Sequence, residues 1–130
     1  VSYREGAVGE PVASLVGAPF YEPFPILTMQ PEEMVAEKLR TLAQRRRATD
    51  LADLAVLLAH DVVDSTVAEY AKVKFELVKQ GRANRIERIE GTVLELADSY
   101  DDQIPLLFPS APTYREAVAI VVPRIRSLVP

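Results

Sequence analysis

The chain has 130 residues, a formal net charge of −4 and no cysteine, which excludes a disulfide scaffold, a thiolate metal site and a cysteine nucleophile. A single histidine, His60, excludes a histidine-rich metal centre, and the acidic balance does not favour binding of nucleic acid through the overall charge. No apolar run is long enough to cross a bilayer and no segment resembles a signal peptide, so we expect a cytoplasmic protein.

Residues 1–30 differ in composition from the rest of the chain. They hold four of the ten prolines and three of the five glycines. This density of helix breakers predicts turns and short strands, at Val1–Glu5, Val12–Val16 and Ile26–Met29. The N-terminal valine fits a lost upstream segment and terminal processing equally well. Three such strands, however, make a poor sheet alone. We therefore expect these strands to complete an upstream core that the sequence lacks.

From Pro31 onward the pattern is helical. Apolar residues at helical spacing predict about five helices, over about 31–45, 49–60, 65–80, 84–100 and 114–128, with a proline-containing loop before the last. Thr113 and Glu116 form the sequence pattern of a capping box at the start of that last helix. The predicted fold is α+β but mainly α: short strands over 1–30 and a helical domain over 31–130.

The segment from Glu32 to Leu57 carries the candidate chemistry. Lys38 lies at the edge of the apolar face of its helix, where a lysine loses hydration unless it meets an anion. Asp50 and Asp53 are one turn apart on the next helix and project from the same side. A short link between the two helices lets them pack antiparallel and brings Lys38 towards either aspartate. With the arginines of 45–47, this arrangement is typical of phosphate binding.

A structural interpretation of the same residues stays open. On sequence alone, a lysine and aspartates on adjacent helices more often form a structural ion pair than a site. Arg45–Arg47 can equally be a solvated helix end that complements the helix dipole.

Two runs in this segment resemble a known family. They are Pro31-Glu-Glu-Met-Val-Ala-Glu-Lys38-Leu-Arg40 and Arg47-Ala-Thr-Asp50-Leu-Ala-Asp53-Leu54. They resemble the latter half of the AbiEii-type nucleotidyltransferases, the toxins of type IV toxin–antitoxin and abortive-infection systems. The resemblance implies the C-terminal part of a polymerase-β-like enzyme that transfers a nucleotide from a nucleoside triphosphate to an acceptor, in some cases tRNA. It also implies a cognate antitoxin as partner.

The resemblance assigns roles to four residues. Lys38 would contact the triphosphate, and Asp50, the acidic residue of the family's fourth motif, would orient Lys38 or the nucleotide. These two are the predicted catalytic residues. Arg47 and Asp53 join Lys38 as predicted nucleotide-binding residues. Thr49 departs from the basic residue usually found directly before that aspartate.

The family's metal site has no counterpart in the sequence. AbiEii-type enzymes carry a Gly-Ser turn and an Asp-x-Asp pair in their N-terminal half, and this sequence contains neither. Phosphoryl transfer of this kind needs carboxylates that hold Mg²⁺ across the phosphates. We therefore expect a portion of an enzyme that uses Mg²⁺ and a nucleoside triphosphate when intact. Alone, this portion should be inactive and bind neither cofactor.

Two other classes of function stay open. The chain could be a non-catalytic helical module that binds an antitoxin or RNA. A groove lined by Lys38, Arg40 and Arg45–Arg47 would then show RNA affinity that falls steeply with salt. Alternatively, it is a structural helical domain of unrelated descent, in which Lys38 pairs with Asp50 or Asp53 and binds no ligand.

Overall fold

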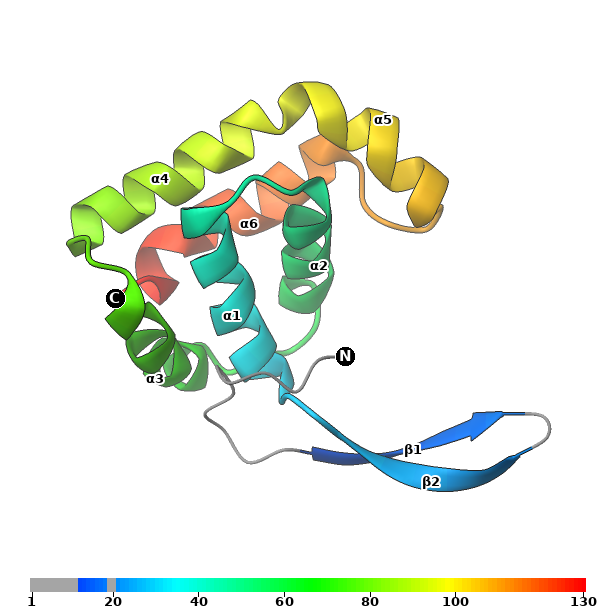
Figure 1. Cartoon of the computed structure of the whole chain (residues 1–130). Helices are drawn as coiled ribbons and strands as arrows, with labels where there is room; N and C mark the ends of the chain where they lie inside the picture. Colours follow the sequence, from blue (N-terminus) through cyan, green and yellow to red (C-terminus); the bar gives the residue numbers. More distant parts are fainter. Residues whose placement is uncertain (1–11, 19–20) are drawn as a thin grey trace.

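The computed structural model describes residues 12–18 and 21–130, with side chains from Met29 onward. The described part of the chain contains six α-helices (Figure 1): α1 (Pro31–Gln44), α2 (Ala48–Leu58), α3 (Asp64–Lys74), α4 (Arg82–Glu95), α5 (Ala97–Leu107) and α6 (Tyr114–Leu128). A short 3₁₀ turn, η1 (Phe75–Leu77), continues α3. None of these helices is long and apolar enough to cross a membrane.

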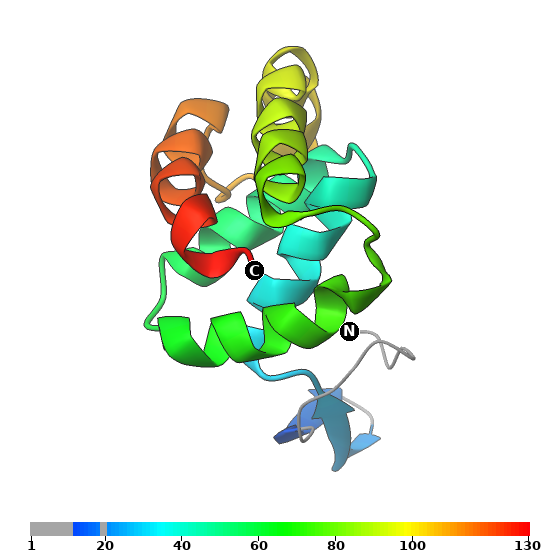
Figure 2. The same ribbon diagram turned by 90° about the vertical axis from the view of Figure 1, so that its left-hand side faces the viewer.

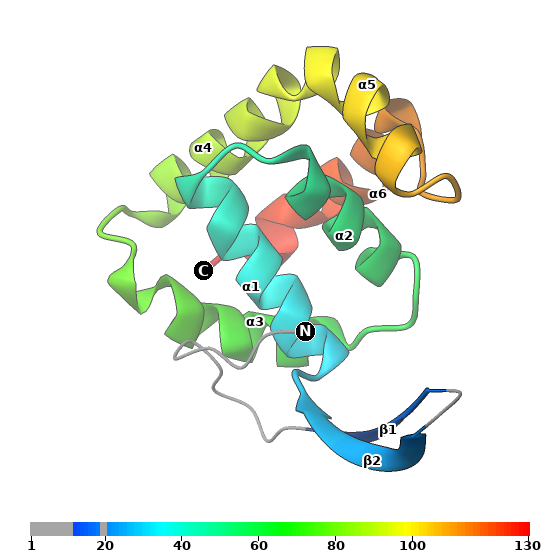
Figure 3. The same cartoon turned by 45° about the vertical axis from the view of Figure 1, so that its right-hand side comes forward.

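Helix α1 lies at the centre of the helical body. It packs against α2, α3 and α4, while α6 packs against α2, α3 and α4. Figure 2 shows α4 and α6 side by side above α1, with α3 below them. In Figure 3, α1 and α2 lie in front of α6 and run in roughly opposite directions. The first two helices are therefore held together by the rest of the bundle.

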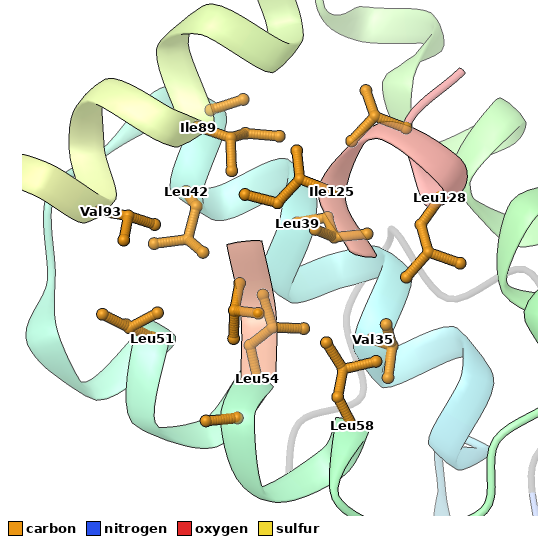
Figure 4. Close-up of a cluster of buried hydrophobic side chains, with 14 of the residues drawn as sticks. Val35, Leu39, Leu42, Leu51, Leu54, Leu58, Ile89, Val93, Ile125 and Leu128 are labelled. Carbon is orange, nitrogen blue, oxygen red and sulfur yellow. The ribbon is translucent and has the colours of Figure 1, made fainter. Parts of the chain in front are cut away.

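The hydrophobic core draws on all six helices, and Figure 4 shows the part of it between α1, α2, α4 and α6. The labelled side chains in Figure 4 point towards one another and recur at spacings of three or four within each helix: Val35, Leu39, Leu42, Leu51, Leu54, Leu58, Ile89, Val93, Ile125 and Leu128. Full burial of one such side chain contributes about 1.5–3 kcal/mol relative to leaving it exposed. This packing fixes the rotation of α1 and α2, and with it the positions of their polar residues.

The strands form a separate hairpin. β1 (Val12–Ala18) and β2 (Tyr21–Thr28) pair antiparallel with each other, and they make a two-stranded sheet that extends away from the helices (Figure 1). A two-stranded hairpin cannot form an independent layer of a fold. The α+β class predicted from the sequence is therefore wrong: the body over 29–130 is all-α, with six helices rather than about five and no strand. The predicted segment Val1–Glu5 lies outside the described residues.

The extra helix arises where the sequence pattern predicts one helix over about 84–100. The chain turns at Leu96, whose φ of −80° and ψ of −3° end α4 and begin α5. Helix α5 then continues to Leu107, through residues that were predicted to be a loop. Pro105 lies in its last turn, where proline removes only the bond to the carbonyl of Asp101, an exposed residue. The predicted capping box of α6 is confirmed, since the Thr113 side chain accepts from the Glu116 amide.

Candidate functional site

The ammonium group of Lys38 lies between two carboxylates of α2. Its Nζ atom is 3.3 Å from Oδ1 of Asp50 and 3.1 Å from Oδ2 of Asp53. Helix α1 presents the lysine, and the three-residue link from Gln44 to Ala48 returns the chain so that α2 presents both aspartates. The structure therefore brings together three of the four predicted site residues.

Asp50 is a buried carboxylate shared by two cations. Only 2% of its side-chain surface is exposed. Besides its contact with Lys38, Oδ2 accepts a 3.0 Å hydrogen bond from Nε of Arg45, and Oδ1 accepts a 3.3 Å bond from Nη2. Asp50 also lies in the first turn of α2, where the helix dipole favours a negative charge. These contacts offset the cost of burying the charge.

Arg47 does not join this cluster. It is the N-cap residue of α2, its side chain is exposed, and it makes no ion pair with the other described residues. The other basic residues of the expected groove are instead held by acidic partners. Arg40 pairs with Glu37 on its own helix, Arg45 shares Asp50 with Lys38, and Arg46 pairs with Glu95 of α4.

A cleft of about 810 Å³ opens beside Lys38, and we call it the Lys38 cleft. Its polar lining consists of Glu37, Lys38, Asp53 and Ser110. Its apolar lining comes from the start of α1, from α2 and from the α5–α6 loop: Met29, Met34, Ala52, Val56, Leu57, Phe108 and Ala111. This volume lies within the usual range for small-molecule sites, about 300–1,000 Å³. The Lys38 cleft is thus lined by both charged and apolar side chains.

Glu37, which lines the Lys38 cleft, belongs to a buried ionic network. Nζ of Lys74, from α3, is 3.2 Å from Oε2 of Glu33 and 3.0 Å from Oε2 of Glu37. Burial raises the pKa of Glu37, but hydrogen bonds and positive charge from Arg40 and Lys74 outweigh burial and hold the pKa below its ordinary value. Glu37 is therefore ionised at neutral pH.

Sequence reasoning missed this network, although a signal was present. Lys74 lies three residues after Ala71 and four before Val78, both of which are buried, so its position belongs to the buried stripe of α3. A lysine on such a stripe requires an acidic partner, and Glu33 and Glu37 lie one turn apart on α1.

A second cleft, of about 700 Å³, lies between the end of α1 and helix α4. It is lined by Gln44, Arg45, Arg46, Arg88, two glutamates and several other residues. Its arginines already have partners: Arg45 bonds to Asp50, Arg46 to Glu95, and Nε of Arg88 to the carbonyl of Ala43. These contacts hold the α1–α2 link against α4. They thereby help to fix the position of Asp50 relative to Lys38.

The described residues do not fit a magnesium site. Among the described side chains, from Met29 to Pro130, no group of three or more histidines, aspartates or glutamates lies where it could hold a metal ion. The carboxylates of Asp50 and Asp53 both contact Lys38, so their oxygens serve the ammonium group instead.

The family comparison agrees with the motifs around this site. Residues 3–120 match the family described as "Nucleotidyl transferase AbiEii toxin, Type IV TA system". The chain belongs to the AbiEii family. The resemblance predicted from the two sequence motifs is therefore confirmed, and the matched range covers Lys38, Asp50 and Asp53 in this AbiEii member. No curated protein and no solved structure matches the chain.

Proposed function

We propose that this chain binds a nucleoside triphosphate in the Lys38 cleft, as the C-terminal portion of a nucleotidyl transferase toxin. The observation that supports this most is the position of Lys38. It is the one cation among the described residues that line the cleft, and 21% of its side-chain surface remains exposed. A lysine ammonium group is a point charge that binds phosphate oxygens well.

The neighbouring residues would position the lysine. Asp50 is buried and held by Arg45, so it can fix the direction of the Lys38 side chain without reaching the ligand itself. Asp53 has 45% of its side-chain surface exposed, so it can move aside when a phosphate takes its place at Nζ. Arg47 lies outside the Lys38 cleft, and its contact with a nucleotide stays a prediction.

We propose further that transfer needs carboxylates outside this sequence. The chain has no Asp-x-Asp pair, which the resemblance assigns to binding Mg²⁺ in the intact enzyme. The chain alone is therefore proposed to bind the triphosphate without transferring the nucleotide, which departs from the sequence-based expectation that it binds neither cofactor. The family description names a toxin of a toxin–antitoxin system, so a cognate antitoxin is the proposed partner, with tRNA as a proposed acceptor.

Isothermal titration of ATP, CTP, GTP and UTP into the chain tests the proposal. At least one should bind, and Lys38→Met should weaken that binding about tenfold or more because the phosphates lose their cation. Lys72→Met is the matched control, since Lys72 is an exposed lysine of α3 that does not line the cleft. Equal affinity in Lys38→Met and the wild type would contradict the proposal.

The same preparation distinguishes the alternative function, a non-catalytic module. Such a module would bind none of the four nucleotides but would bind RNA or the antitoxin. Its RNA affinity would fall steeply between low and physiological salt.

A further inference from the structure

Besides Lys38, large apolar side chains line the Lys38 cleft. Helix α2 contributes Val56 and Leu57, and the α5–α6 loop contributes Phe108. Phe108 and Val56 remain 47% and 42% exposed in the described residues. Large apolar side chains that line a concave site and stay exposed are typical of ligand-binding surfaces rather than of a core.

The loop that carries Phe108 is fixed by hydrogen bonds. The Phe108 amide donates to the carbonyl of Ile104 over 2.7 Å, and the Phe108 carbonyl accepts from the amide of Ala111 over 3.0 Å. One residue further on, the carbonyl of Pro112 accepts a 2.7 Å bond from the hydroxyl of Tyr100, a buried residue of α5. The aromatic ring is therefore presented from a braced backbone, which lowers the entropy lost on binding.

The charged and the aromatic residues that line the cleft together define the ligand it fits. Helix α1 offers a cation at Lys38, and the α5–α6 loop offers an aromatic ring at Phe108, with Ser110 two residues further on. A ligand that satisfies both needs an anionic end and a planar, largely apolar end that carries hydrogen-bonding groups at its edge. A nucleotide has this composition, and its base stacks on aromatic side chains.

We propose that Phe108 is the stacking residue for the base of the bound nucleotide, with Ser110 placed to hydrogen-bond to the edge of the base. This inference rests on the proposed function, because it uses the same cleft. It adds a division of labour: Lys38 recognises the phosphates and Phe108 recognises the base. The affinity for a nucleotide and the affinity for its phosphate chain alone should therefore depend on different residues.

Two probes separate these contributions: a nucleoside triphosphate and inorganic tripolyphosphate, each titrated into the wild type and into variants. Phe108→Ala should weaken nucleoside triphosphate binding at least about fivefold and leave tripolyphosphate binding unchanged. Phe108→Tyr should retain the nucleotide affinity because it keeps the ring. Leu107→Ala is the matched control, since Leu107 is the exposed neighbour of Phe108 and does not line the cleft.

The outcomes distinguish this inference from the proposed function. If Lys38→Met weakens both probes but Phe108→Ala changes neither, the cleft binds phosphates and the stacking role is wrong. An equal loss of both probes in Phe108→Ala also overturns that role, because it would reflect damage to the whole cleft. If the wild type binds neither probe, both proposals fail. Thermal melting of Phe108→Ala close to that of the wild type verifies that the variant is folded.

Discussion

Two lysines of this protein each contact two carboxylates, yet their replacement by methionine should have very different effects on stability. Lys38 contacts Asp50 and Asp53 at the Lys38 cleft, while Lys74 contacts Glu33 and Glu37 between α1 and α3. Methionine keeps most of the length of the lysine stem and removes the charge. The comparison therefore measures what each ammonium group contributes to folding.

The expected costs follow from what each carboxylate retains. After Lys38→Met, Asp50 still accepts two hydrogen bonds from Arg45, and the half-exposed Asp53 regains water. The free energy of unfolding should fall by only about 1 kcal/mol, the scale of a partly exposed ion pair. After Lys74→Met, Glu33 loses this lysine while only 1% of its side-chain surface is exposed. Removing one partner of a buried pair costs about 3–5 kcal/mol.

Thermal unfolding followed by circular dichroism measures the difference. For a domain of this size, 1 kcal/mol corresponds to a change of about 4 °C in Tm. Lys38→Met should therefore melt about 4 °C below the wild type, and Lys74→Met more than about 12 °C below it. If Lys38→Met were as unstable as Lys74→Met, the reasoning that Arg45 and water compensate for the lost lysine would be refuted, and the Lys38 cluster would contribute to folding as a buried structural ion pair.

Three further predictions concern the helices and the α5–α6 loop. Gly91→Ala should raise the free energy of unfolding, measured by urea titration, by about 0.5–1 kcal/mol. The reason is that Gly91 lies inside α4 and an added Cβ meets no atom within 4 Å. A lower free energy of unfolding would show a close contact there. Thr113→Ala should lower the free energy of unfolding by about 1 kcal/mol because α6 loses its N-terminal cap. An unchanged free energy of unfolding would mean that the cap contributes nothing to stability. Burial, followed by nearby carboxylates, raises the pKa of Tyr100 to about 12. In the unfolded chain this hydroxyl ionises near pH 10. The contribution of neutral Tyr100 to the free energy of unfolding should therefore be complete below pH 10 and be lost as the pH rises towards 12. Tyr100→Phe should weaken that alkaline loss in urea titrations at pH 9 and pH 11, and an identical loss in both proteins would contradict the assignment.

The Lys38 cluster could be predicted because its geometry is local. Helical spacing places Lys38 at the edge of an apolar face, and a link of three residues brings Asp50 and Asp53 back towards it. Only the sharing of Lys38 by both aspartates, and the two bonds from Arg45 to Asp50, required the structure.

The features that sequence reasoning missed depend on contacts between distant segments or on a single backbone angle. The pairing of Lys74 with α1 joins residues about forty positions apart, and Phe108 reaches the Lys38 cleft only because α5 continues past Pro105. That continuation runs against the sequence signal, because proline usually ends or kinks a helix. The change of direction at Leu96 has no signal, because leucine is an ordinary helix former. The predicted α+β class failed because propensity identifies extended segments but cannot say whether they join a packed layer.

Protection of individual lysines by nucleotide tests the central claim most directly. The chain is treated with an amine-acetylating reagent, with and without a saturating nucleoside triphosphate, and the modification of each lysine is followed by mass spectrometry. The account predicts that the nucleotide slows acetylation of Lys38 and leaves that of Lys72 and Lys79, which are exposed and lie outside the cleft, unchanged. Equal acetylation of Lys38 with and without bound nucleotide would contradict the claim that Lys38 contacts the phosphates.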